Sequence, residues 1–155
     1  GRLPVTFYAS DADLPDFGDY DMPGHTYRYF QGKPLFPFGH GLSFSKFKYR
    51  RAKYRDDVLR IPVKNVSKID GDEVVQVYIK KADDVDGPIM SLRGFKRVTV
   101  KAGKKAVVEI PMSAENIDLF NPETGKMEAA PGKYIVYYGG TSDITKLRKL
   151  KITIR

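Results

Sequence analysis

The sequence contains no cysteine and only two histidines among its 155 residues. Without cysteine the chain has no disulfides, no thiolate zinc site and no cysteine nucleophile. The two histidines, His25 and His40, are too few for a histidine-rich metal site. No run of about 18 or more apolar residues occurs, so no segment is predicted to span a membrane. Because 41% of the residues are hydrophobic, the chain can bury a core, as one domain with an attachment or one large domain.

An apolar signal region is also missing from the first residues. Residues 1–8, Gly-Arg-Leu-Pro-Val-Thr-Phe-Tyr, instead have the pattern of a buried strand already in progress. We therefore expect the chain to be a piece of a longer protein. On that interpretation, the missing signal carries no information about export.

Basic residues dominate two stretches of a chain whose formal net charge is +8, at 46–55 and at 146–155. An electrostatic footprint for nucleic acid also needs a recognition motif, and none is present. In the second stretch Leu150, Ile152 and Ile154 alternate with polar residues, which is the pattern of a half-buried strand. We interpret both stretches as solvent-facing sides of strands and expect neither nucleic acid nor a membrane as a partner.

Short alternating segments separated by turn signals fill the chain from about residue 46 onward. In the segment around residue 60, Leu59, Ile61 and Val63 share one face, and Pro62 suggests an edge strand or a bulge. About seven short strands at roughly 10-residue spacing, without a long amphipathic helix, predict an all-β antiparallel β-sandwich. The expected strands lie near 47–49, 58–66, 73–80, 92–100, 106–112, 133–140 and 147–154, with a short element at 117–120.

Residues 26–45 hold six aromatics, two prolines and three glycines, without helical or strand periodicity. An exposed aromatic side chain keeps a large apolar area in water, so a flexible linker does not have this composition. The prolines favour an extended path. We predict that this stretch is an extended, irregular strap fixed along a folded surface.

Several segments resemble glycoside hydrolase family 3, the β-glucosidases and β-xylosidases. Pro-Phe-Gly-His-Gly-Leu-Ser at 37–43 resembles the end of the link into the last, fibronectin type III-like domain of that family. Gly-Asp-Glu-Val-Val-Gln-Val-Tyr at 71–78, Leu-Arg-Gly-Phe-Lys-Arg-Val at 92–98 and Pro-Gly-Lys-Tyr at 131–134 resemble segments of that domain itself. The stretch from residue 7 to residue 30 is more similar to β-xylosidases, with His25 where they usually carry Arg.

The resemblance implies three parts: the last strand of a truncated α/β-sandwich domain at 1–8, an interdomain strap at 9–45, and a fibronectin type III-like domain at 46–155. The resemblance also implies cleavage by two carboxylates, a nucleophile in an N-terminal barrel domain and an acid/base that in many members lies in the α/β-sandwich domain. Neither catalytic motif is present, so we expect no catalytic residue, no cofactor and no turnover by this chain. The implied parent is a secreted or periplasmic exo-acting glycosidase, and its missing domains and, through them, an oligosaccharide are the implied partners.

The aromatic side chains of the strap have two possible uses, because sugars also stack on exposed aromatic rings. The candidate rings for stacking are those of Tyr27, Tyr29, Phe30, Phe36 and Phe38. Three of these five belong to Phe, which offers no polar group to a sugar hydroxyl, so we favour packing between domains. The predicted interdomain packing residues are Tyr27, Tyr29, Phe30, Phe36, Phe38 and Leu42. The alternative hypothesis is a stand-alone β-sandwich module that binds polysaccharide or a cell surface, which requires a solvent-exposed strap.

Two groups of acidic residues are candidate sites. Five aspartates fall within 11–21, but Leu14-Pro15 interrupts the spacing of a calcium loop, so we expect a solvated loop and no metal. Asp70, Asp72 and Glu73 lie at a turn that enters a strand. We interpret these three as exposed, without a buried partner that would separate their pKa values for acid and base roles.

Overall fold

The computed structural model describes residues 1–114, 117–121, 124–129 and 131–155. Two short helical turns, η1 (Asp11–Asp13) and α1 (Thr26–Tyr29), precede the strands. No helix in these ranges is long and apolar enough to cross a membrane. The strands are β1 (Phe47–Tyr49), β2 (Lys53–Arg55), β3 (Val58–Asn65), β4 (Gly71–Lys81), β5 (Ser91–Val100), β6 (Lys105–Pro111), β7 (Asp118–Asn121), β8 (Lys126–Ala129), β9 (Gly132–Gly139) and β10 (Arg148–Ile154).

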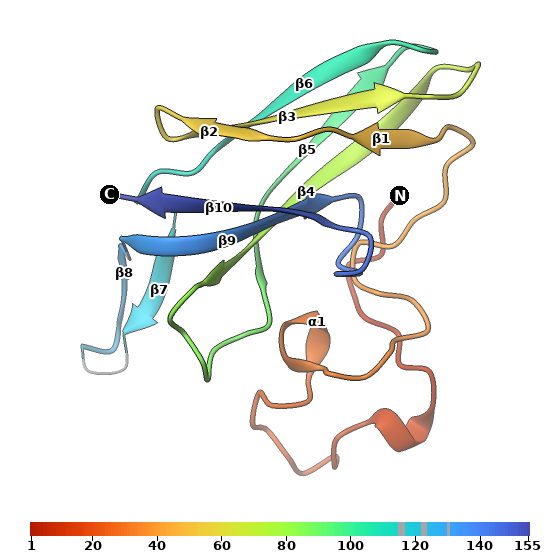
Figure 1. Cartoon of the computed structure of the whole chain (residues 1–155). Coiled ribbons are helices and arrows are strands. Elements are labelled where there is room, and N and C mark those ends of the chain that lie inside the picture. Colours follow the sequence, from red (N-terminus) through yellow and green to blue (C-terminus); the bar gives the residue numbers. More distant parts are fainter. Residues whose placement is uncertain (115–116, 122–123, 130) are drawn as a thin grey trace.

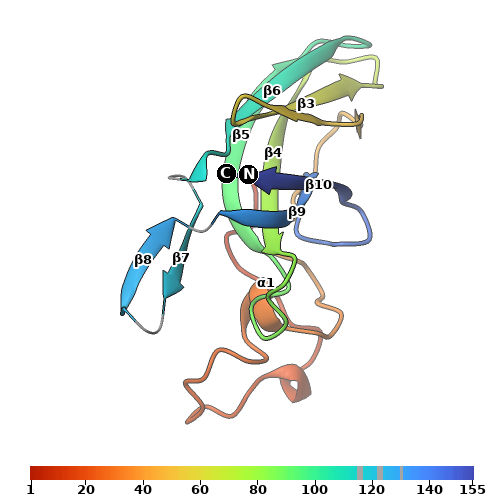
Figure 2. The same ribbon diagram turned by 60° about the vertical axis from the view of Figure 1, so that its left-hand side comes forward.

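Two antiparallel sheets form the body of the protein (Figure 1). In the first sheet β3 pairs with β6 on one side and with β1 and then β2 on the other. The second sheet has the order β10-β9-β4-β5. A separate hairpin of β7 and β8 projects from the body (Figure 2). The predicted antiparallel β-sandwich is confirmed.

The core lies between the two sheets and follows the period-2 alternation of the strands. Leu59, Ile61 and Val63 of β3 are fully buried, as are Val75 and Val77 of β4. The faces predicted from the sequence for these two strands are therefore the buried ones. β9 and β10 complete this core with alternate side chains of their own.

Strand β3 is an internal strand, so the expected edge position of Pro62 is wrong, but the alternative of a bulge holds, because residues 50–52 lie opposite only Ile61 and Pro62. Pro62 lies where the ladder passes from β1 to β2, and its carbonyl accepts a hydrogen bond from the Arg50 amide at 2.9 Å. In an antiparallel strand, the nitrogen and the carbonyl group of one residue point toward the same neighbouring strand. The Pro62 nitrogen, which carries no proton, therefore points toward the break between β1 and β2 and not toward β6. The missing donor therefore leaves no partner unsatisfied in the ladder with β6.

Residues 1–8, expected to form a strand, make only a single bridge, between Phe7 and Phe36. A strand is stabilised by pairing with a neighbouring strand, and within the described ranges the backbone-to-backbone hydrogen bonds of these residues go only to residues 35–40. Residues 9–45, called the strap below, then form an irregular loop at one end of the sandwich (Figure 1).

Two adjacent valines of β6 provide a matched test of the core. Val108 is 1% exposed and Val107 is 59% exposed. Val108→Ala should lower the free energy of unfolding by about 1–3 kcal/mol, because it removes buried methyl groups and leaves a cavity. Val107→Ala should change it by less than about 0.5 kcal/mol. Chemical denaturation followed by circular dichroism measures both, and equal losses would contradict this placement of the core.

Candidate functional site: the strap and its contacts with the sandwich

A buried glutamine of β4 joins the strap to the residue that follows β9. Gln76 lies on the outer face of β4 and is only 3% exposed. Its Nε2 donates to the carbonyl oxygen of Gly39 at 3.2 Å and to that of Gly140 at 2.9 Å, while its Oε1 accepts the Tyr78 hydroxyl proton. Each polar atom of this buried amide is thus paired, which removes the main cost of burying it.

Only glycine fits at position 39. Its φ is +76°, in the left-handed region that L side chains avoid, and an added Cβ would lie 2.0 Å from Gln76 Oε1. The first glycine of the Gly-His-Gly triplet therefore lets the strap backbone approach β4 closely. His40, between the two glycines of this triplet, packs its ring 5.0 Å from the ring of Phe36.

Aromatic rings extend this contact along the outer face of β4. Tyr27 stacks on Phe38, with ring centroids 4.5 Å apart, and meets Tyr78 edge-on at 5.7 Å. The Tyr27 hydroxyl accepts a hydrogen bond from the Leu92 amide at 3.0 Å. Burial raises the pKa of Tyr78 and keeps its hydroxyl protonated as the donor to Gln76.

A buried ion pair anchors the segment that precedes the strap. Arg2 Nη2 lies 2.7 Å from Glu73 Oε1, which also accepts the Tyr49 hydroxyl proton at 3.0 Å. Glu73 is 4% exposed, so the expectation that it is exposed without a buried partner is wrong. Burial raises the pKa of Glu73, and the Arg2 charge and the Tyr49 hydrogen bond oppose that shift. This pair could not be predicted from the sequence, because its members are 71 positions apart.

The six residues predicted to pack between domains do not share one environment. Tyr27 and Phe38 pack on the sandwich of this same chain. Phe30 meets Tyr8 edge-on at 4.8 Å, and Phe36 meets Phe7 edge-on at 6.2 Å. The remaining two are Tyr29, which is half-buried beneath the Arg28 guanidinium, and Leu42, which is 92% exposed.

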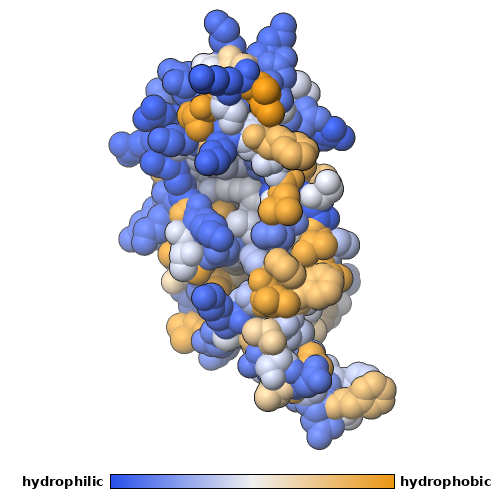
Figure 3. All heavy atoms as spheres, turned by 90° about the vertical axis from the view of Figure 1, so that its right-hand side faces the viewer, coloured by the Kyte–Doolittle hydropathy of each residue, from blue (hydrophilic) through white to orange (hydrophobic). Residues whose placement is uncertain are grey.

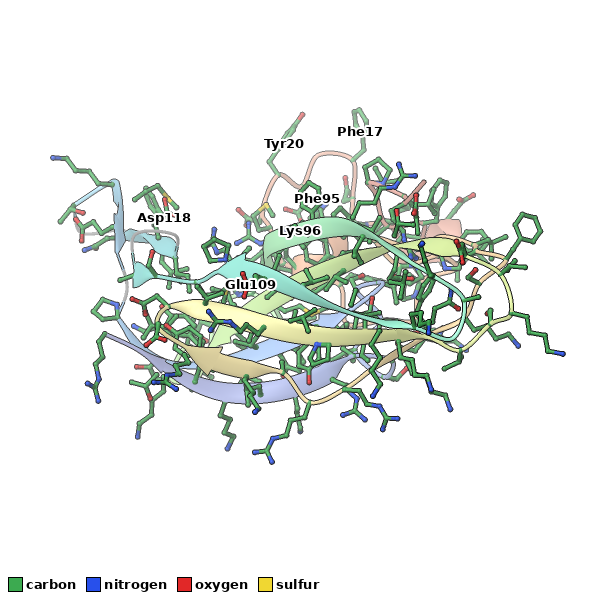
Figure 4. All side chains as sticks on the ribbon, turned by 90° about the horizontal axis from the view of Figure 1, so that it is seen from above. Phe17, Tyr20, Phe95, Lys96, Glu109 and Asp118 are labelled. Atoms are coloured by element: carbon green, nitrogen blue, oxygen red, sulfur yellow. The ribbon has the colours of Figure 1, made fainter. Side chains whose placement is uncertain are left out.

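The side of the strap that faces away from the sandwich is rich in exposed apolar side chains. Phe17, Tyr20 and Phe44 are 98%, 89% and 97% exposed. Figure 3 shows apolar side chains gathered down the face of the molecule that carries the strap. Phe17 and Tyr20 point away from the rest of the molecule (Figure 4). These three residues are not among the predicted packing residues, because the sequence of an irregular segment does not indicate which way an aromatic side chain points.

The polar groups of this site hold segments of the chain together. The side chains of Arg2, Glu73 and Gln76 form hydrogen bonds between segments of this chain, so their role is to hold these segments together. No cluster of three or more His, Asp or Glu side chains that could hold a metal ion occurs within the described ranges. Each aspartate of the 11–21 loop is exposed.

Comparison with known proteins agrees with this architecture. Residues 73–142 match the family model of the Fibronectin type III-like domain. The chain is 45% identical over 160 residues to the Xylan 1,4-beta-xylosidase of Xylanibacter ruminicola, a match that covers 99% of this chain and 18% of that protein. It is 28% identical to the Periplasmic beta-glucosidase of Salmonella typhimurium, covering 90% and 21%. The crystal structure of the beta-glucosidase from Kluyveromyces marxianus superposes with a TM-score of 0.83 at 31% identity, covering 100% and 21%.

The fold is a fibronectin type III-like β-sandwich with an irregular segment packed against it. The chain belongs to the C-terminal region of the glycoside hydrolase family 3 β-xylosidases and β-glucosidases. It spans about a fifth of the length of the curated relatives it matches.

Removal of Arg2 should leave the buried carboxylate of Glu73 without its cation. We expect Arg2→Met to lower the free energy of unfolding by about 1–3 kcal/mol at pH 7, because an unpaired buried charge is costly. Losing Arg2 raises the pKa of Glu73 further above the ordinary value of 4.5. The native state then binds the proton more tightly than the unfolded state, so stability falls as pH rises above 4.5.

Denaturant titrations of Arg2→Met at pH 4 and pH 7 measure this difference, and the loss should be smaller at pH 4. Arg97→Met is the matched control, because it breaks an exposed ion pair with Asp72 on the same strand as Glu73. It should change stability little at either pH. An equal loss for Arg2→Met at both pH values would contradict the assigned role of Glu73.

Proposed function

We propose that this chain is the non-catalytic, structural C-terminal part of an exported, exo-acting glycoside hydrolase of carbohydrate metabolism. In this proposal the sandwich holds the strap on one side, and the strap presents its other side to the catalytic domains. Residues 1–8 would be the last strand of the α/β-sandwich domain, 9–45 the interdomain strap and 46–155 the fibronectin type III-like domain. Cleavage would take place in the missing domains.

The observation that carries the proposal is the two-sided environment of the strap. Gly39, Tyr27 and Phe38 are fixed to the sandwich, whereas Leu42 and Phe44, a few residues further on, are almost fully exposed. Exposed apolar side chains close together in an ordered segment are typical of an interaction surface. In the parent protein this surface would be covered by the preceding domains, with Leu42, Tyr29, Phe30 and Phe36 among the contacts.

The relatives support a proposal for the sugar specificity and the location of the parent protein. The identity to the xylosidase of Xylanibacter ruminicola is 45%, against 28% to the Salmonella typhimurium glucosidase. We therefore favour a parent of the β-xylosidase type, with β-glucosidase as the alternative. Export is supported by the periplasmic relative. An oligosaccharide would be a partner through the catalytic domains of the parent.

The test is restoration of activity by this chain. The Xylanibacter ruminicola xylosidase would be truncated to remove the region that matches this chain, and the truncated protein co-expressed with the chain. We expect the two to co-purify and to hydrolyse a nitrophenyl xyloside several-fold faster than the truncated protein, while the chain by itself shows no turnover.

The strap surface is tested in the same assay by the double variant Leu42→Ser, Phe44→Ser. Loss of two apolar side chains that would become buried in the complex should cost about 3 kcal/mol, roughly a hundredfold in the association constant. Phe95→Ser is the control, since Phe95 is 68% exposed on β5 of the sandwich (Figure 4). Turnover by the chain by itself, or an equal effect of both changes, would sink the proposal.

A further inference from the structure

Positive charge is concentrated in two segments of this chain. Residues 46–55 contain six lysines and arginines and residues 146–155 contain five, and neither segment contains an aspartate or a glutamate. The rest of the chain has 16 basic and 19 acidic side chains and is net negative. The charge of +8 therefore arises entirely from these two segments, whose basic side chains are called the cationic margin below.

The two segments lie side by side in the fold. The Tyr138 hydroxyl accepts the Ala52 amide proton at 3.0 Å and donates to the Arg50 carbonyl oxygen at 3.1 Å, and Tyr138 is paired with Arg148 in the ladder of β9 and β10. A cleft of about 490 Å³ lies between β2 and β10, lined by Arg51, Lys53, Arg55 and Lys151 among others. Figure 4 shows nitrogen-tipped side chains in a row along β10 and beside β2.

The charges of the cationic margin are not used to stabilise the sandwich. All eleven basic side chains are exposed. Within the described ranges only two of them have a carboxylate partner, Arg55 with Asp56 at 3.4 Å and Lys146 with Asp143 at 3.0 Å. A solvent-facing strand accounts for the exposure of these residues. It does not account for the exclusion of every acidic residue from both segments, which favours an anionic ligand.

The chemistry of the margin favours a chain of spaced carboxylates. Neither segment has an exposed large apolar side chain that could insert into a membrane or stack on a base. Tyr54, at the cleft, is half-buried, and its hydroxyl contacts Asp57 Oδ1 at 2.8 Å and the Met112 carbonyl oxygen at 3.1 Å. Exposed lysine and arginine without an aromatic platform can pair with carboxylates along an extended polymer.

We propose that the cationic margin binds a polysaccharide that carries carboxylates, that is, uronic acid groups. The choice of a polysaccharide rests on the proposed function as part of a glycosidase. The margin would hold the parent protein on acidic stretches of a substrate polymer while the catalytic domains act on chain ends. In the fold, β2 and the end of β10 lie away from the strap, so contacts at the cleft between them and at the strap surface can form at once (Figures 1 and 2).

Equilibrium binding of the 155-residue chain to immobilised xylan tests the proposal. The ligand is xylan substituted with glucuronic acid, and the control is the same xylan after chemical reduction of its carboxyl groups. We expect binding to the acidic xylan, weakened by salt, and at least tenfold weaker binding to the reduced xylan. The margin variant is Arg51→Gln, Lys53→Gln, Lys149→Gln, Lys151→Gln. The matched control variant is Lys96→Gln, Lys101→Gln, Lys104→Gln, Lys105→Gln.

The margin variant should bind the acidic xylan about tenfold more weakly, since each exposed ion pair contributes about a factor of two. The control variant loses the same charge at exposed positions elsewhere and should bind like the unmodified chain. Equal binding to both xylans, or equal losses in both variants, would overturn the proposal. Tighter binding to single-stranded DNA than to acidic xylan at the same salt would also overturn it, in favour of nucleic acid. The margin variant should still restore activity to the truncated relative, so the two proposals fail separately.

Discussion

The contact between the Gln76 amide and the Gly39 carbonyl is the constraint on which the arrangement of the strap depends. It is made on the outer face of β4, where a strand of an exposed sheet would normally present its side chains to water. Because Gln76 and Tyr78 are buried there, the strap is part of the folded body at this point. The rings of Tyr27 and Phe38 then extend the contact by packing on Tyr78 and on each other.

This constraint gives the strap two unlike sides. The chain is held at Arg2 by a buried ion pair and at Gly39 by Gln76, and it exposes Leu42 and Phe44 just beyond the second of these points. A segment held in this way can present apolar side chains in a fixed position, which lowers the entropic cost of binding a neighbouring domain. The similarity to family 3 glycosidases supplies the identity of that neighbour in our proposal.

The sandwich could be predicted from the sequence because the alternation in β3 and β4 repeats over enough residues to assign a buried face. Strand β2 was missed, because its two-residue turn uses Asp56 and Asp57 with φ of 52° and 54° in place of the usual Asn-Gly signal. The site was only partly predicted. The aromatic composition of the strap indicated docking, but Gln76 lies at an outward position where a polar residue is expected to be exposed. The cationic segments were recognised, and only the fold showed that they lie together.

Amide hydrogen exchange tests the docked strap most directly. The amides of Ile89 and Ser142 donate to strap carbonyls, at 2.7 Å to Arg28 and at 2.9 Å to Phe38. If the strap is part of the folded body, these two amides should exchange at least a hundredfold more slowly than in an unfolded chain, with protection that approaches that of β4. Exchange of both amides at the unfolded rate, while β4 remains protected, would contradict the account.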